Sequence, residues 1–351
     1  MKINRRKIIL PTMMLLLLTA IQASTAAISF AEHYTVTLLY TDIVTGIGGL
    51  VTSINNLGQV AGISQSNDKA NPNQNVHAVL FAEGKMHYLG SLGIDPSFAF
   101  GINNSGQVVG YSITKPRGAA PAAHAALYNN GTVIDLGTLG GNSSRANGIN
   151  DPGQIVGESL TADGATHAAL FVGGKVIDLG TLGGRNSYAT SINKSGQVVG
   201  SSYLSGNNIH YHAALFANGD VTDLGSLGGS SDAQSINDSG VAVGSADTGK
   251  GFHAVEFSGG RVIDLGTLGG DFSTARCINN FGQIVGNSHT ASNVTHAMLF
   301  ENGMITDLNS LIDPNSGWIL ELATGINDAG QIIGTGKFKG KHSAFLLTPV
   351  R

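Results

Sequence analysis

The chain has 351 residues, of which 42% are hydrophobic and only 12% are charged, with 50 glycines and a single cysteine. The charged share is about half the usual quarter. The glycines recur at regular intervals, which indicates repeated turns and excludes a disordered low-complexity tract. The single cysteine, Cys277, excludes an intramolecular disulfide.

Residues 1–26 have the pattern of a secretory signal peptide. Basic residues from Lys2 to Lys7 precede an apolar run from Ile8 to Ile21, and small residues follow up to Ala26. The run is shorter than the ~20 residues that span a membrane comfortably, so cleavage after Ala26 is preferred over an uncleaved anchor. We therefore expect residues 27–351 to form the mature protein, exported to the periplasm or the medium, with no transmembrane segment.

Cleavage changes the charge of the chain because the leader contains four basic residues and no acidic ones. The mature chain then carries 15 lysines and arginines against 23 acidic residues, a net charge of −8. This balance argues against nucleic acid or an anionic membrane as a partner.

The rest of the chain repeats one unit of about 45 residues. The pattern I-N-x-x-G-(Q)-h-h-G, where h is apolar, begins at seven positions: Ile54, Ile102, Ile149, Ile192, Ile236, Ile278 and Ile326. The steps between them are 48, 47, 43, 44, 42 and 48 residues. A period of this length is typical of a repeat array or a closed ring.

The copy around Ile149 shows the content of one unit. It predicts four strands, at Ser144–Asn150, Gln154–Ser159, His167–Phe171 and Lys175–Leu179, joined by a tight Asp-Pro-Gly turn, a loop and a Gly-Gly hairpin turn. No window has helical periodicity of useful length. Four short antiparallel strands in one repeat are typical of a β-propeller blade, so an all-β fold is expected.

The two ends of the chain indicate a closed ring. The last copy has three strands, Leu322–Asn327, Gln331–Gly334 and Ser343–Leu347, and no fourth. A lone strand, Tyr34–Leu39, precedes the first copy and fits the missing place. We predict a single-domain, seven-bladed β-propeller with four-stranded blades, closed by its N-terminal strand so that neither sheet edge stays bare at the seam.

The repeated DLGTLGG…A…IN..GQ(V/I)VG.S…HA.LF, together with Gly317-Trp318 and Leu347-Thr348-Pro349 near the end, resembles the bacterial extracellular HAF-repeat proteins. The resemblance covers Tyr34 to Arg351. It implies an exported repeat protein, and it brings no catalytic residues that could be transferred to this chain.

One histidine recurs in each copy, at the start of the third strand. A metal ring is a possible interpretation, because imidazole is a common metal ligand, but these strands lie too far from the axis to share an ion. We favour instead a hydrogen bond from each imidazole to the aspartate of DLG or the asparagine of IN in the same blade, which satisfies the polar atoms of the imidazole. The aspartate is absent from two copies, and Tyr88 takes its place in one of them. The set is His77, His124, His167, His212, His253, His296 and His342.

One asparagine also recurs in each copy and heads the turn after the first strand, where its side chain can bond backbone amides two residues on. We interpret it as structural. The set is Asn55, Asn103, Asn150, Asn193, Asn237, Asn279 and Asn327. Cys277 takes a place that other copies fill with glycine or serine, so we expect a small buried thiol.

Motifs for catalysis are missing from the sequence. LGTLGG is followed by no helix and no Lys-Ser/Thr, so it does not qualify as a phosphate loop. No G-x-S-x-G, HExxH or paired-cysteine pattern occurs. Glutamates are few, and Glu158 alone follows a second-strand glycine next to a loop. We expect no metal and no cofactor.

Variation between the copies is concentrated in the links that leave one face of the predicted ring, such as the predicted loop Ser202–Tyr211. Loops on a uniform scaffold commonly carry recognition, although drift in solvated loops is an equal alternative. Candidate ligand-binding residues on this face and near the channel mouth are Tyr111, Arg117, Arg145, Arg185, Tyr188, Tyr203, His210, Tyr211, Asp232, Asp271 and Arg276.

We therefore expect a monomeric, non-catalytic binding or structural module whose partner is a glycan, a peptide or another envelope ligand. The alternative is a glycan hydrolase or lyase with its site in the central channel. Two carboxylates, or a tyrosine or histidine with an arginine, converging there from different blades favour the enzyme.

Overall fold

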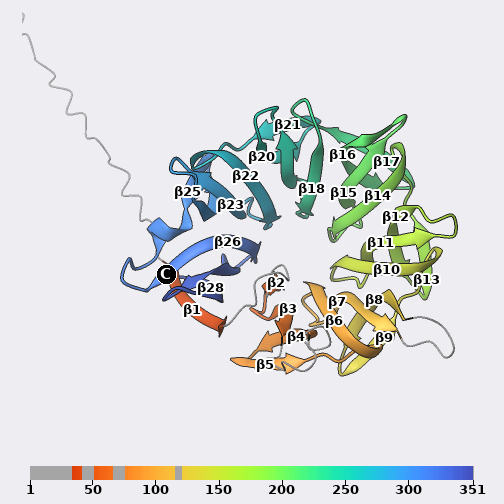
Figure 1. Ribbon diagram of the computed structural model, residues 1–351, viewed down its shortest axis with the longest axis horizontal. Coiled ribbons are helices and arrows are strands. Elements are labelled where there is room, and N and C mark those ends of the chain that lie inside the picture. The colour runs from red at the N-terminus through yellow and green to blue at the C-terminus, as the bar shows by residue number, and fades with distance from the viewer. Residues whose placement is uncertain (1–33, 42–50, 66–75, 115–120, 351) are drawn as a thin grey trace, which may run out of the picture. The chain divides into compact units, whose positions relative to one another are not determined.

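Short β-branched segments separated by glycine turns form seven four-stranded antiparallel sheets in the computed structural model, which describes residues 34–41, 51–65, 76–114 and 121–350. Figure 1 shows the sheets arranged as blades of a ring. The predicted signal peptide and Arg117 lie outside the described residues. Glu32–Arg351 forms one compact unit.

Each blade has the strand order expected from the repeat, with the strand before the I-N turn innermost and the next three following outward. The strands are β2 (Val51–Ile54), β3 (Val60–Gln65), β4 (Val76–Ala82) and β5 (Lys85–Tyr88) in blade 1; β6 (Gly93–Ile102), β7 (Val108–Thr114), β8 (Ala122–Asn129) and β9 (Thr132–Asp135) in blade 2; β10 (Gly140–Ile149), β11 (Ile155–Thr161), β12 (Thr166–Val172) and β13 (Lys175–Asp178) in blade 3; β14 (Gly183–Ile192), β15 (Val198–Leu204), β16 (Asn207–Ala217) and β17 (Asp220–Gly225) in blade 4; β18 (Ser231–Ile236), β19 (Ala242–Asp247), β20 (Phe252–Ser258) and β21 (Arg261–Asp264) in blade 5; β22 (Gly269–Ile278), β23 (Ile284–Thr290), β24 (Thr295–Glu301) and β25 (Met304–Asp307) in blade 6; and β26 (Trp318–Ile326), β27 (Ile332–Phe338), β28 (Lys341–Pro349) and β1 (Tyr34–Thr41) in blade 7.

The seam lies in blade 7, where the N-terminal strand supplies the outermost position. β1 pairs antiparallel with β28, from Tyr34 opposite Pro349 to Thr41 opposite Ser343. The fold class is therefore confirmed as a seven-bladed β-propeller closed by its N-terminal strand. Pairing the two ends of the chain removes the free edges that an open array presents.

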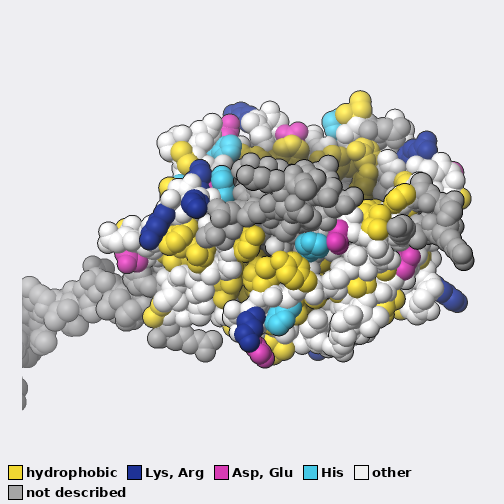
Figure 2. Space-filling model, turned by 60° about the horizontal axis from the view of Figure 1, so that its bottom comes forward, with side chains coloured by type: hydrophobic (Ala, Val, Ile, Leu, Met, Phe, Trp, Pro, Cys, Tyr) yellow, Lys and Arg dark blue, Asp and Glu magenta, His cyan; other side chains and the backbone are white. Residues whose placement is uncertain are grey.

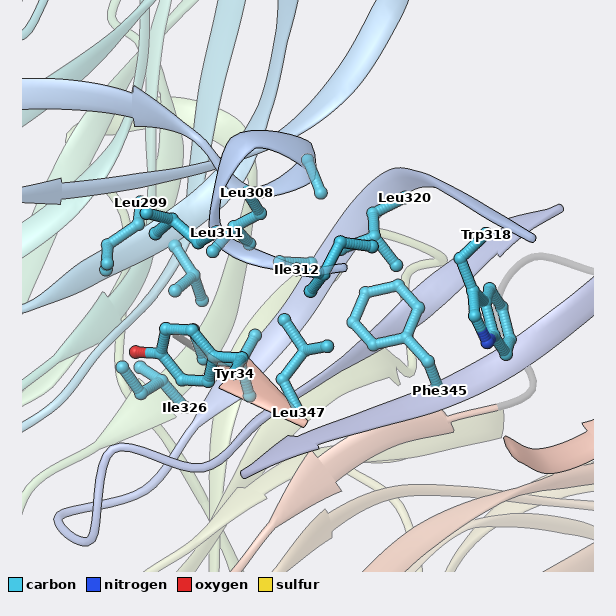
Figure 3. Close-up of a cluster of buried hydrophobic side chains, with 14 residues drawn as sticks. Tyr34, Leu299, Leu308, Leu311, Ile312, Trp318, Leu320, Ile326, Phe345 and Leu347 are labelled. Atoms are coloured by element: carbon cyan, nitrogen blue, oxygen red, sulfur yellow. The ribbon is translucent and has the colours of Figure 1, made fainter. Parts of the chain in front are cut away.

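The largest hydrophobic side chains gather at this seam. Figure 3 shows Tyr34 of β1 among Leu320, Phe345 and Leu347 of blade 7, with the leucines of the preceding link above them. Phe345 and Leu347 are fully buried, and Trp318 packs edge-on against Phe345 with ring centroids 5.9 Å apart. The other buried clusters are smaller and are built mainly of valine, alanine and isoleucine, so the junction between the two chain ends has the largest apolar cluster among the described residues.

The hairpins between third and fourth strands use the predicted turn residues. Asn130 and Gly131 both have positive φ, 48° and 77°, as the twist-matched two-residue turn requires. One prediction about the links was wrong. The predicted loop Ser202–Tyr211 is mostly strand, because Gly206 at φ 69° closes a tight turn between β15 and β16. The blade 6 link, which lacks the Gly-Gly pair, contains a short 3₁₀ turn, η1 (Leu308–Leu311), within the otherwise all-β fold.

Candidate functional site

A belt of asparagines closes the end of the channel on the face of the short I-N turns, called here the turn face. In blade 3 the Asn150 Oδ1 accepts the backbone N–H of Gln154 at 2.8 Å, and its Nδ2 donates to Gln154 Oε1 at 2.8 Å and to the carbonyl of Asn193 at 3.0 Å. The last of these bonds recurs between every pair of neighbouring blades at 3.0–3.3 Å, including Asn327 to Asn55 across the seam. All seven asparagines are buried, so each joins a turn to the next blade.

The residue after each asparagine forms a second, exposed circle around a cavity of about 210 Å³. Its backbone N–H donates to the side-chain oxygen of the equivalent residue in the next blade, for example Asn104 to Asp151 at 2.9 Å. The circle is interrupted at Lys194, whose side chain has no acceptor. The carboxylates here accept bonds from neighbouring asparagines. The polar groups at this end of the channel are therefore used mainly in contacts between blades.

The recurring histidines lie near the rim of each blade and bond within it. In five blades the His Nδ1 lies 2.6–2.9 Å from the aspartate of DLG, which also accepts a backbone N–H two residues on, as with Asp135 and Gly137 at 2.8 Å. The predicted His–Asp bond is thus present there. Where that aspartate is absent, His77 faces Asp95 at 3.3 Å and His342 faces Glu321 at 3.8 Å. Figure 2 shows histidines at separate places on the surface, and the described residues contain no metal-binding cluster.

Small residues surround the middle of the channel, in a space of about 170 Å³. A Cβ added to Gly101 lies 3.1 Å from the carbonyl of Asn147 and 3.3 Å from Cα of Gly148 in the next blade. The backbones therefore leave no room for larger side chains where the seven inner strands converge. Cys277 belongs to this circle, and burial raises the pKa of its thiol, which fits the predicted unreactive thiol.

Every inner strand contains a β-bulge two residues before the isoleucine of the I-N turn. In blade 3, Ala146 pairs with Gly157 and Gly148 with Val156, so Asn147 is left between them without a partner. The facing glycine is required, because a Cβ on Gly157 lies 1.9 Å from the carbonyl of Arg145. A bulge redirects a side chain. The seven bulge residues, which we call the bulge ring, are Thr52, Phe100, Asn147, Thr190, Gln234, Arg276 and Thr324.

Four members of the bulge ring serve the contacts between blades. The Thr190 hydroxyl donates to the carbonyl of Ala233 in the next blade at 2.7 Å, and Thr52, Asn147 and Thr324 make the equivalent bond at 2.8–3.1 Å. The other three differ. Gln234 bonds Asp232 in its own strand, whereas Phe100 and Arg276 have no hydrogen-bonded side-chain partner among the described residues. Phe100, Gln234 and Arg276 therefore differ from the other four members of the bulge ring, because they do not make this hydrogen bond to the next blade.

The bulge ring surrounds a cavity of about 560 Å³, which we call the mouth cavity. It lies at the end of the channel opposite the turn face, which we call the loop face. Arg145 and Glu158 reach the cavity from blade 3, and Leu322 adds apolar surface. Arg145 and Arg276 are exposed and come from blades 3 and 6, which are as far apart as a ring of seven allows. Two guanidinium groups therefore flank one opening.

An adjoining side cavity of about 380 Å³ shares Arg145 and Glu158 with the mouth and adds Tyr111 and Tyr188 from blades 2 and 4. Aromatic rings order this region. Phe98 stacks on Tyr111 with centroids 4.4 Å apart, and the Arg145 guanidinium lies 4.1 Å from the centroid of Phe100. A cation over an aromatic face is attracted by the ring quadrupole, so Arg145 is held at the rim.

Among the described residues, three acidic groups line the two cavities, one carboxyl and two phenols. Burial raises the pKa of Glu158, against the opposing effects of Arg145 and of a hydrogen bond from Asn147. Burial also raises the pKa of Tyr111 and of Tyr188. Both phenols therefore keep their protons at neutral pH and act as hydrogen-bond donors. Glu158 is the only carboxylate among the described residues that line the two cavities.

The structure brings four of the sequence candidates together and leaves the others apart. Tyr111, Arg145, Tyr188 and Arg276 line the mouth or the side cavity. The remaining described candidates lie elsewhere: Arg185 near the carbonyl of Asp163, Tyr203 and Tyr211 as a cross-strand pair, His210 beside that pair in β16, Asp232 bonded to Gln234 and Ser245, and Asp271 paired with His289 at 3.0 Å.

Sequence reasoning missed Phe100, Asn147 and Gln234 as parts of the site. The signal was present in the repeat: two residues before the isoleucine of each I-N motif, the copies read T, F, N, T, Q, R, T. This position varies within an otherwise uniform strand, but the alternation of the strand does not reveal that a bulge turns it towards the channel.

No protein-family profile matches the chain, and no curated protein matches it either. Solved structures match at the level of fold. A puromycin-hydrolysing peptidase of Mycobacterium tuberculosis has a TM-score of 0.52 and 8% identity, covering 87% of this chain and 53% of the peptidase. The β-propeller domain of the Trilobed protease of Pyrococcus furiosus has a TM-score of 0.51 and 7% identity, covering 85% of this chain and 95% of that domain.

TolB of Acinetobacter baumannii matches at a TM-score of 0.47 and 13% identity, over 70% of this chain and 61% of TolB. The chain thus spans about half to two thirds of the length of the peptidase and of TolB. Identities this low show the β-propeller fold alone. Within the described part of the chain, no helix has the length and apolarity needed to span a membrane.

Proposed function

We propose that this protein is an exported β-propeller that binds an extracellular or envelope ligand at the mouth cavity without changing it chemically. The bulge ring carries the proposal, because its specialised members, Phe100 and Arg276, leave their side chains available to a ligand while the remaining inner-strand positions hold the ring together. Export rests on the leader pattern and on the resemblance to HAF-repeat proteins.

The chemistry of the cavities supports binding over catalysis. Glycoside hydrolysis commonly uses two carboxylates at a defined separation, and Glu158 stands alone among the described residues lining these cavities. Aromatic faces, guanidinium groups and amides are instead the groups that orient a bound ligand. The raised pKa of each phenol suits a donor role.

A glycan lyase is the second candidate, and one observation favours it. Tyr188, Arg145 and Glu158 converge in the side cavity from two blades, and a lyase needs a base beside a group that neutralises a carboxylate. Against this, a tyrosine base requires a lowered pKa, whereas burial raises the pKa of Tyr188.

A glycan and peptidoglycan array scored for both retention and cleavage tests the proposal. We expect the purified protein to retain a subset of glycans unchanged, and Phe100→Ala to reduce that retention. Release of shortened or unsaturated products contradicts the binding function and favours the lyase. Retention of nothing on the array rejects the proposed function.

A further inference from the structure

The mouth cavity concentrates positive charge in a protein that is otherwise acidic. The mature chain carries a net charge of −8, yet the charged side chains lining the mouth are two arginines and one glutamate. The ion pairs of the described residues involve neither Arg145 nor Arg276, although Arg145 lies opposite Glu158 on the neighbouring strand and favours the charged form of that carboxyl. A guanidinium presents a planar fork of donors that matches a carboxylate, so these two groups are placed to receive anions from a ligand.

The spacing of the arginines favours a ligand with more than one acidic group. Arg145 leans on Phe100 from blade 3, and Arg276 belongs to blade 6 across the opening. Two acidic groups, one on each side of the opening, can each pair with one arginine. An extended oligomer with repeated carboxylates can span the mouth and contact each arginine with a different residue.

The surface between the arginines favours a sugar over a peptide. Phe100 offers one aromatic face, against which the apolar C–H face of a sugar ring can stack. Asn147 and Gln234 offer their amide oxygens, because the amide nitrogen of each already donates within the protein. Thr52, Thr190 and Thr324 keep free acceptor capacity on their hydroxyl oxygens. A ring of polar groups around one aromatic side chain suits a ligand rich in hydroxyl groups. An apolar peptide anchor finds only Leu322.

We propose that the mouth cavity recognises an oligosaccharide of uronic acid units, with Arg145 and Arg276 binding carboxylates and Phe100 stacking on a sugar ring; this rests on the binding function proposed above. Binding should weaken as salt screens the attraction between the arginines and the carboxylates of the ligand.

Isothermal titration calorimetry with trigalacturonic acid, its fully methyl-esterified form and poly-L-glutamate tests this inference on the full mature chain. We expect the acid to bind and the neutral ester and the polypeptide to bind at least about 10-fold more weakly, a ratio that corresponds to 1.4 kcal/mol. Arg276→Gln and Arg145→Gln should each weaken binding of the acid about 10-fold, because each removes a charge-assisted pair. Arg276→Lys should be intermediate, because it keeps the charge and loses the fork.

The matched control is Arg261→Gln, which removes an exposed arginine at the start of β21, next to the Gly259-Gly260 hairpin turn and away from both cavities. It should leave the affinity unchanged, and all variants should keep the wild-type melting temperature. Equal binding of acid and ester overturns anion recognition and leaves the binding function intact. Equal binding of poly-L-glutamate overturns the choice of a sugar. If the acid does not bind, the uronate inference is wrong, and retention of any other array ligand then decides whether the binding function survives.

Discussion

The two ends of the channel are built from the same seven strands, and only two residues lie between Asn147 of the bulge ring and Asn150 of the belt. At the turn face the residue is the same in every blade and each side chain bonds the next blade. At the loop face the bulge residue changes from blade to blade, and two of the seven make no bond between blades or within their own strand. The comparison indicates that the residue type is the same in every blade where its polar groups are all used to close the ring. The residue type varies where ring closure does not use those groups.

The largest expected effect comes from straining the bulge that separates the turn face from the loop face in one blade. Gly157→Ala places a Cβ 1.9 Å from the carbonyl of Arg145, so β10 and β11 must separate, at a cost of about 3 kcal/mol in the free energy of unfolding. Gly173→Ala is the matched control, because Gly173 has positive φ and open space around it, and it should cost only about 1 kcal/mol. Urea unfolding measures both. Equal losses contradict the role given to the bulge.

A smaller loss should follow from opening the belt at one blade. Asn150→Ala leaves the N–H of Gln154 without its acceptor and removes one of the two donors to the carbonyl of Asn193, which should lower the free energy of unfolding by about 2 kcal/mol. Asn147→Ala, three residues earlier and only partly buried, should cost about half as much. If the two variants unfold at the same urea concentration, the contrast between the two ends is not real.

Arg276→Gln should change stability very little. The side chain is exposed and has no ion pair with a described residue, so the free energy of unfolding should stay within about 0.5 kcal/mol of wild type. The unchanged stability of this loop-face variant should contrast with the loss of stability expected for Asn150→Ala at the turn face. A thermal melt of the variant measures it, and a loss above 1 kcal/mol, by the same standard, shows that Arg276 holds the ring.

Glu158 provides a pH-dependent test with a small effect. Its pKa is raised in the folded state, so the native protein binds this proton more tightly than the unfolded chain does. The unfavourable contribution of Glu158 therefore grows as pH rises through the ordinary value of 4.5 towards the raised folded pKa, and is absent below both. Glu158→Gln should be more stable than wild type at pH 7 and equal to it at pH 3.5. A constant difference between the two pH values contradicts the assigned cause.

Much of the fold could be predicted because its determinants are local. The repeated Asn-Gly and Gly-Gly turns, the alternation of the strands and the unmatched strand at Tyr34–Leu39 together specify seven blades and the closure. The channel lining could be predicted only in part. Arg145 and Arg276 could be predicted as charged residues near the mouth, whereas Phe100 was missed because a bulge cannot be recognised from one strand alone. Its traces are the variable position itself, two residues before the isoleucine of the I-N motif, and the glycine on the facing strand, such as Gly157, which resembles the other glycines of the repeat.

Hydrogen exchange with and without bound trigalacturonic acid tests the central claim most directly, because it reports on both ends of the channel in one measurement. The account predicts protection in the peptides that contain Phe100, Arg145 and Arg276 in β6, β10 and β22, with no change in the turns that follow Asn55 or Asn327. Protection confined to those turns contradicts it, because the ligand is then bound at the end assigned to closing the ring.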